Sequence, residues 1–311
     1  MSQEILKLEK PEFLSPSTIN SFISYRHSWY SQKVLGRGFS STHYFERGKA
    51  IEEGVRMVLE GSDLAEATRV ANKMIRDGIK SGNLSKDDVE ECSNYVLMME
   101  DFIKTASDKI SQYGKLRDRE DSRWTKLGVR IEFKHPLIPI PLYGFLDFLY
   151  DDVCVDLKVK AKKPSGLDQG YIQQGLIYQW GTGVPVVFEN LVYTSKGYNM
   201  YPLWLNKVPF IEKQEKYLVA AANNLIAVYD AIYEGDCEKL LKAMSFPNLS
   251  AVWNKNEKDE LFEDFVTNCP FINTSETIKR NPLTSEPIEE KPKEDIVSTV
   301  LSEPKRKSCP L

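Results

Sequence analysis

The stretch from Tyr143 to Lys163 constrains the fold most, because apolar and polar residues alternate in it on both sides of Asp151-Asp152. Alternation with a period of two is typical of strands, whose successive side chains point to opposite faces of a sheet. A two-residue turn at the aspartate pair would be the shortest common hairpin connection. With this turn, Asp147 faces Asp156 on the neighbouring strand.

The register of this hairpin sorts its side chains into two chemically different faces. One face is apolar or aromatic and suits a core: Leu146, Phe148, Tyr150, Val153, Val155, Leu157 and Val159. The other face carries Phe145, Asp147, Leu149, Cys154, Asp156, Lys158 and Lys160. Since a slip of one residue would turn the apolar set to water, we expect this register to be specified by the pattern.

The second face places two carboxylates side by side, with Lys158 next along the strand. Like charges directly opposite on a sheet cost stability, so folding alone gives no reason for the pair. A divalent cation would remove the repulsion and take Asp147 and Asp156 as ligands. The alternative is a solvated hairpin face with salt links such as Asp156 to Lys160. The residues alone leave both interpretations open.

We expect helices before this hairpin and a mixture of helices and strands after it. Ser15-Pro16 is a typical helix start. The first predicted helix begins near Ser15, and the others cover about 45–59, 64–79, 85–110, 167–180 and 210–233. The predicted strands cover 127–134, 142–150, 153–160, 186–194 and 198–205. This layout indicates an α/β (α+β) fold, a mixed central sheet flanked by helices with an N-terminal helical portion.

The composition narrows the possible chemistry. Five scattered cysteines without a CxxC pair argue against a zinc site and against disulfides, and three histidines argue against a histidine-rich metal site. A bound metal would therefore be a hard cation held by carboxylates. The net charge of -4 does not exclude DNA, because a basic groove can lie in an acidic surface. Without a membrane span or a signal-peptide core, we expect a cytoplasmic protein with no membrane partner.

The hairpin and the helix after it carry a resemblance to the RecB-like exonuclease branch of the PD-(D/E)XK nucleases. The hairpin supplies Gly144, Asp147 and Asp156-Leu157-Lys158, and the helix supplies Gln174 and Tyr178 in the spacing Gln-x-x-x-Tyr. Positions four apart share a helical face, so both side chains can reach one site.

Upstream residues extend the same resemblance. Arg47-Gly48 followed by Glu52 is similar to a helix start with a metal ligand four residues after the glycine, and LSPSTINSFISYRHSWY resembles the first helix of the branch. Each motif is weak, but the ordered set over about 14–253 is specific. The chain is most similar to phage-encoded, stand-alone members.

The resemblance implies a restriction-endonuclease-like fold and Mg²⁺-dependent hydrolysis of DNA phosphodiester bonds, with Mn²⁺ as a substitute. One or two ions would be held by Glu52, Asp147, Asp156 and the backbone carbonyl of Leu157. Glu52 stands where many relatives have histidine, and Glu53 is a neighbouring alternative. Lys158 would be catalytic, either orienting the attacking water or neutralising the transition state; both roles stay open.

The resemblance also implies DNA contacts. Gln174 and Tyr178 would position the strand, and the phosphates would meet Arg47, Lys160, Lys162 and Lys163. An iron–sulfur cluster, which some relatives carry, is not expected. In those relatives one early cysteine and three late cysteines hold the cluster. The position of the early cysteine falls in the region 25–27 of this sequence, a region that has no cysteine, and the late triplet is missing.

Three functions follow as hypotheses. The leading one is an exonuclease that hydrolyses linear DNA from its ends in recombination, replication or DNA degradation, with a recombinase or a single-strand-binding protein as a further partner. The second is a structure-specific or DNA-processing endonuclease, and the third is a non-catalytic DNA-binding protein on the same fold. We expect a single nuclease domain over 1–270, with a helical portion at about 14–112, a catalytic core at about 125–205 and C-terminal helices at about 207–268.

Residues 272–311 contain no aromatic residue, while prolines recur and acidic and basic residues alternate. Such a composition buries too little apolar surface to offset the entropy of ordering, so we expect a disordered tail.

Overall fold

The computed structural model describes residues 11–24, 29, 32–33, 42–81, 84–117, 124–125, 128–195 and 197–234. All of them belong to the first of two compact units, which is Met1–Trp253. The expected tail, the predicted helices beyond residue 234, the region 25–27 and three of the cysteines lie outside the described residues. Of the described helices, none has the length and apolar character that a membrane crossing requires.

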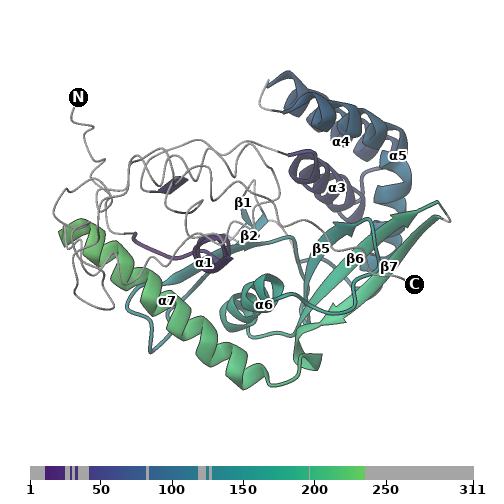
Figure 1. Cartoon of the computed structure of the whole chain (residues 1–311). Helices are drawn as coiled ribbons and strands as arrows, with labels where there is room; N and C mark the ends of the chain where they lie inside the picture. Colours follow the sequence, from purple (N-terminus) through teal and green to yellow (C-terminus); the bar gives the residue numbers. More distant parts are fainter. Residues whose placement is uncertain are drawn as a thin grey trace, which may run out of the picture. The chain divides into compact units, whose positions relative to one another are not determined.

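The helices fall into two groups in Figure 1. One group is α3 (His43–Leu59), α4 (Leu64–Lys80) and α5 (Lys86–Ile110), followed by the short helix η1 (Ser111–Tyr113). The other group is α1 (Pro16–Ser24), α6 (Gln169–Thr182) and α7 (Ile211–Glu234), with the short helix η2 (Leu205–Lys207) before α7.

Side-chain caps set the starts of four of these helices. The hydroxyl of Ser15 accepts from the amide of Thr18 at 3.1 Å, which confirms the expected start of α1. The same kind of bond begins α4 at Asp63, α5 at Ser85 and α6 at Asp168.

The strands form two sheets. The first is antiparallel, with the order β1 (Trp124–Thr125), β2 (Gly128–Phe133) and β3 (Leu142–Leu146). The second has the order β4 (Phe148–Leu149), β5 (Cys154–Lys160), β6 (Val186–Thr194) and β7 (Gly197–Trp204). Only β5 and β6 are parallel among these pairs, and α6 makes the crossover between them. The predicted α/β class with a mixed sheet is confirmed.

The predicted hairpin register is confirmed. Phe148 pairs with Val155, and the amide of Tyr150 donates to the carbonyl of Val153 at 2.9 Å, as a two-residue turn requires. The single strand that we predicted over 142–150 is wrong, however. The chain bends at Asp147, which lies between β3 and β4 and belongs to neither strand.

The two hairpin faces are both covered. The apolar face joins the core beneath α3, α4 and α5 through Phe148, Tyr150, Val153, Val155 and Leu157. The other face is covered by α6, so the alternative of a solvated hairpin face is wrong: Leu149, Cys154 and Asp156 are all buried. Asp156 therefore carries a carboxylate in the interior, where a charge is costly unless it is paired.

Candidate active site

Asp147 and Asp156 come together where the chain leaves β3. Asp147 lies at the bend after β3, and its Oδ2 accepts a hydrogen bond from the backbone amide of Leu157 at 2.8 Å. Asp156 is the residue before Leu157 on β5 and is fully buried. The bend therefore holds the first carboxylate beside the strand that carries the second.

Lys158 completes the hairpin part of the site. Its Nζ forms an ion pair with Oδ2 of Asp156, and its side chain is 21% exposed. Burial lowers the pKa of the Lys158 ammonium, but the carboxylates of Asp156 and Asp147 raise it by more, so the net pKa lies above its ordinary value. Lys158 is thus a positive charge at neutral pH.

Glu52 approaches this pair from α3. Burial raises the pKa of Glu52, the Arg56 guanidinium lowers it, and the charge of Asp156 raises it again, with a net rise. For Asp147, burial and then the charges of Glu52 and Asp156 raise the pKa well above its usual range. The charge of Asp156 thus raises the pKa of both Glu52 and Asp147, and the charge of Glu52 raises that of Asp147.

Arg56 binds both Glu52 and its neighbour Glu53. This arginine is buried, and its guanidinium bonds Oε1 of Glu52 at 2.7 Å and Oε2 of Glu53 at 2.6 Å. Both glutamates share the arginine, but it is Glu52 whose charge interacts with Asp156 and Lys158. The phase of α3 therefore turns Glu52 toward the hairpin. Glu52 and Arg56 are four residues apart with opposite charges, a spacing visible in the sequence that favours an ion pair on one face of a helix.

The carboxylates do not form a closed metal cage. In the ranges that the structure describes, no group of three or more histidine, cysteine, aspartate or glutamate side chains is arranged to hold a metal ion. The donor chemistry nevertheless fits a hard divalent cation, because the site brings together three oxygen-bearing acids whose charge Lys158 and Arg56 offset only in part. Binding of a cation would displace protons from these groups.

Gln174 and Tyr178 of α6 connect the helix to both carboxylate-bearing segments. The Nε2 group of Gln174 donates to Oδ1 of Asp156 at 3.1 Å and to the hydroxyl of Tyr178 at 2.7 Å. The Tyr178 hydroxyl donates in turn to the carbonyl of Phe145 at 2.6 Å. Gly144 fits the same arrangement, since a Cβ there would lie 3.0 Å from the Tyr178 ring. These contacts support the hairpin; any contact of Gln174 and Tyr178 with a DNA strand remains an expectation.

Of the three lysines that follow Lys158, Lys160 and Lys163 lie near aromatic rings. Lys160 donates to the hydroxyl of Tyr171 at 2.6 Å, and the ammonium of Lys163 lies 4.7 Å from the centre of the Tyr201 ring. Lys162 is exposed. This end of the strand is therefore positively charged and accessible.

Arg47 lies inside the protein and not at the surface where we expected a phosphate contact. Its side chain is 2% exposed. It donates to the hydroxyls of Tyr95 at 3.1 Å and Tyr193 at 2.8 Å, and to the carbonyl of Val159 at 3.2 Å. The guanidinium thus ties α3 to α5 and to the end of β5, five residues before Glu52.

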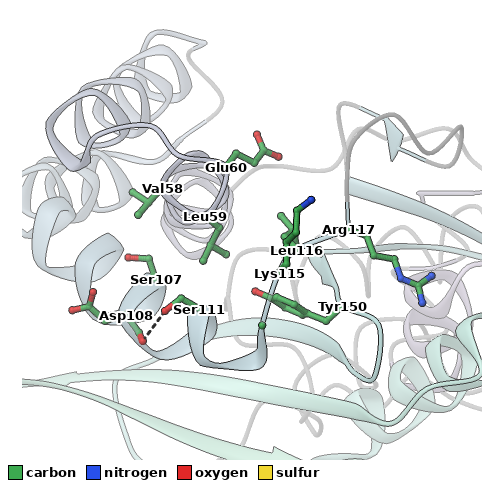
Figure 2. Close-up of a pocket in the computed structure, with 11 residues that line it drawn as sticks. Val58, Leu59, Glu60, Ser107, Asp108, Ser111, Lys115, Leu116, Arg117 and Tyr150 are labelled. Carbon is green, nitrogen blue, oxygen red and sulfur yellow. Dashed lines mark hydrogen bonds between the residues drawn. The ribbon is translucent and has the colours of Figure 1, made fainter.

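A separate cavity of about 570 Å³ lies at the C-terminal ends of α3 and α5 (Figure 2). Its charged groups have both signs: Glu60, Asp108, Lys115 and Arg117. Tyr150 also lines it, and the Tyr150 hydroxyl donates to the carbonyl of Ile110 at 3.2 Å. Because Tyr150 belongs to the core-facing side of the hairpin, this cavity is distinct from the site around Asp156.

A scan against protein-family models and a search of the curated proteins both found no match to this chain. The function therefore rests on the geometry and the electrostatics of the site.

Proposed function

We propose that the chain is a metal-dependent deoxyribonuclease with a restriction-endonuclease-like core, of the RecB-like exonuclease branch of the PD-(D/E)XK nucleases. The observation that carries the proposal is the convergence of Glu52, Asp147, Asp156 and Lys158 from a helix, a bend and a strand. Folding alone does not require such a set, because like charges cost stability at a buried position, as at Asp156, and at partly buried ones, as at Asp147 and Glu52. A catalytic site that binds a cation and a phosphate does require it.

The metal ligands would be Glu52, Asp147 and Asp156, together with the carbonyl of Leu157. When bound there, Mg²⁺ or Mn²⁺ would lower the pKa of a water molecule and polarise a phosphoryl oxygen. The protein's contribution is to keep the acids oriented. Leu157 holds one oxygen of Asp147, and Gln174 holds one oxygen of Asp156.

Lys158 would act as a fixed positive charge and not as a base. The neighbouring carboxylates raise the pKa of the Lys158 ammonium, which favours its protonated form and suits a fixed charge better than a base. Its ion pair with Asp156 holds it beside the metal ligands. There it would either stabilise the charge that develops on the phosphate oxygens or orient the attacking water.

Lys160, Lys162 and Lys163 would meet the DNA phosphates beyond the scissile bond, where they continue from Lys158 along β5 and the loop after it. Such contacts give affinity that falls steeply with salt. A structure-specific endonuclease is the second candidate, because the same cluster would hydrolyse an internal phosphodiester bond. A non-catalytic DNA-binding protein is less well supported, since binding does not need the acids gathered around the buried Asp156.

The test is digestion of linear and covalently closed circular DNA, each single- and double-stranded, with Mg²⁺ and with EDTA. The exonuclease proposal predicts progressive loss of linear DNA with Mg²⁺ and resistance of the circles. Equal rates on circles would favour the endonuclease, and binding without cleavage of any substrate would favour the non-catalytic alternative.

A further inference from the structure

Three aromatic side chains form a row beside the candidate active site. The ring centroids of Phe13 and Tyr143 are 4.6 Å apart, and those of Tyr143 and Phe145 are 5.0 Å apart. Tyr143 and Phe145 are two residues apart on β3 and share a face of the strand. Asp147 follows two residues after Phe145, at the bend where β3 has ended. We call Phe13, Tyr143 and Phe145 the aromatic row.

The aromatic row lines a cavity of about 540 Å³. Helix α6 contributes Tyr171, Gln174 and Tyr178 to the same cavity. Because Gln174 also donates to Asp156, the cavity lies one side chain away from a proposed metal ligand. Pockets of this volume take a small molecule or a single nucleotide.

The polar groups around the cavity suit a nucleotide. Asn20 lines it, and within the described part of the chain its Oδ1 is buried without a hydrogen-bond partner, while its Nδ2 donates to the carbonyl of Gly170 at 3.0 Å. An unpaired acceptor is satisfied by an N–H donor, such as an amino or imino group on the edge of a base. Positive charge is supplied by Lys33, which also lines the cavity, and by Arg130, whose guanidinium lies 5.0 Å from the centre of the Tyr143 ring.

We propose that the aromatic row binds bases of an unpaired strand next to the scissile phosphate, so that the DNA end enters single-stranded. This inference rests on the proposed nuclease function and adds its substrate class. Inside a duplex, both faces of a base stack on neighbouring pairs, and the last pair of a blunt end exposes one face but keeps its Watson–Crick edges paired. Only an unpaired base can offer a ring face to Phe13 and an edge to Asn20.

The exposure of the rings supports an entry from the outside. Phe13 is 43% exposed, whereas Tyr143 and Phe145 are partly buried. The outermost ring is therefore free to stack on a base, and the inner two continue toward Asp147. A phenylalanine that is exposed to this extent loses little folding stability when it is replaced, so its substitution is a clean test.

The experiment measures DNA affinity of the full chain in EDTA by fluorescence anisotropy, with a single-stranded 12-mer and a blunt 12-base-pair duplex as probes. The variant is Phe13→Leu. The matched control is Phe45→Leu, since Phe45 is 47% exposed and lies on α3 outside the cavity. Stacking of one base predicts that Phe13→Leu weakens single-strand binding by roughly 5- to 100-fold and leaves duplex binding unchanged. Phe45→Leu should change neither affinity.

A second arm uses single-stranded 12-mers with one abasic position. The inference predicts that wild-type protein loses affinity when the base near the bound end is removed, and that this loss disappears in Phe13→Leu. Equal losses on single strand and duplex, no loss on single strand, or an abasic penalty that persists in the variant would each overturn the inference. If any of these results is found while the wild-type protein still cleaves linear DNA, only the single-strand inference fails and the nuclease proposal stands. Ring-dependent binding without Mg²⁺-dependent cleavage would sink the nuclease proposal instead.

Discussion

The carboxylate of Asp147 and the backbone amide of Leu157 are joined by a hydrogen bond of 2.8 Å. This bond holds an acid from the bend after β3 against the strand that carries Asp156. A backbone N–H stabilises the ionised form of Asp147 but does not offset burial and the two neighbouring acids, so the pKa of Asp147 stays raised. Without a cation, Asp147 must therefore either take up a proton or remain ionised beside the charges of Glu52 and Asp156.

Asp147→Asn should stabilise the metal-free protein at neutral pH. Because the folded pKa is raised, the folded protein binds the proton more tightly than the unfolded chain. The protonated Asp147 therefore contributes to the free energy of unfolding. This contribution is fully present below the unfolded pKa of about 3.9 and is lost as pH rises through the folded pKa. Asparagine keeps an acceptor for Leu157 and does not titrate. The advantage of the variant should grow from pH 4 to pH 8 and reach roughly 1–3 kcal/mol in denaturant unfolding with EDTA. A pH-independent difference would contradict this account.

Burial also raises the pKa of Asp156, although Lys158 lowers it in part. Asp156→Asn nevertheless removes the ion-pair partner of Lys158, so we expect a net loss of stability, unlike Asp147→Asn. A partly buried ammonium without its carboxylate is costly, so we expect a loss of about 2–4 kcal/mol. Lys158→Met in the same chain should recover much of that loss. A double-mutant cycle by urea unfolding measures the coupling between the two side chains. Additive effects of the two changes would show that the pair does not act as a unit.

Glu52→Gln and Glu53→Gln form a matched pair, since both side chains bond to Arg56. We expect similar, modest effects on stability. Only Glu52→Gln should raise the Mg²⁺ concentration needed for half-maximal cleavage, because only Glu52 is expected to be a ligand. The measurement is a Mg²⁺ titration of cleavage for both variants, with thermal unfolding as the control. If Glu53→Gln raised the required Mg²⁺ concentration more than Glu52→Gln, the ligand would be Glu53 and not Glu52.

Substitutions of Arg47 and Lys160 should have different effects: the first should lower folding stability, and the second should weaken DNA binding. Arg47→Met leaves three acceptors without their donor and should lower the free energy of unfolding by about 3 kcal/mol. Its effect on the salt dependence of DNA binding should be negligible. Lys160→Ala should leave unfolding nearly unchanged and reduce the slope of log affinity against log salt by about 1. The opposite pattern would return Arg47 to the DNA-binding surface.

The hairpin could be predicted from the sequence because its register depends on local features. The two-residue turn at Asp151-Asp152 and the period of two are both visible along one short stretch, and Phe148 does pair with Val155. The break at Asp147 could not be predicted in this way. The alternation continues through the bend, so the pattern hides the point at which β3 ends and β4 begins.

The surroundings of the site depend on residues far apart in the chain. The burial of Arg47 requires Tyr95 and Tyr193, which lie on α5 and β6 and have no local signature in the sequence. The covering of Asp156 by α6 likewise depends on tertiary packing. The aromatic row was missed for a similar reason, since Phe13 and Tyr143 meet only when the chain before α1 lies beside β3.

The central claim is that the acids around Asp156 form a hydrolytic metal site, and the most direct measurement compares wild type with Asp147→Asn. Both proteins are followed by thermal unfolding and by cleavage of linear DNA during a Mg²⁺ titration. We predict that Mg²⁺ raises the Tm of wild type and supports cleavage, since an ion that binds only the folded state stabilises it. In Asp147→Asn, the Tm in EDTA should be equal or higher, the Tm shift with Mg²⁺ should be lost, and cleavage should fall by a factor on the order of 10³. A folded Asp147→Asn protein that cleaves DNA at nearly the wild-type rate would contradict the account.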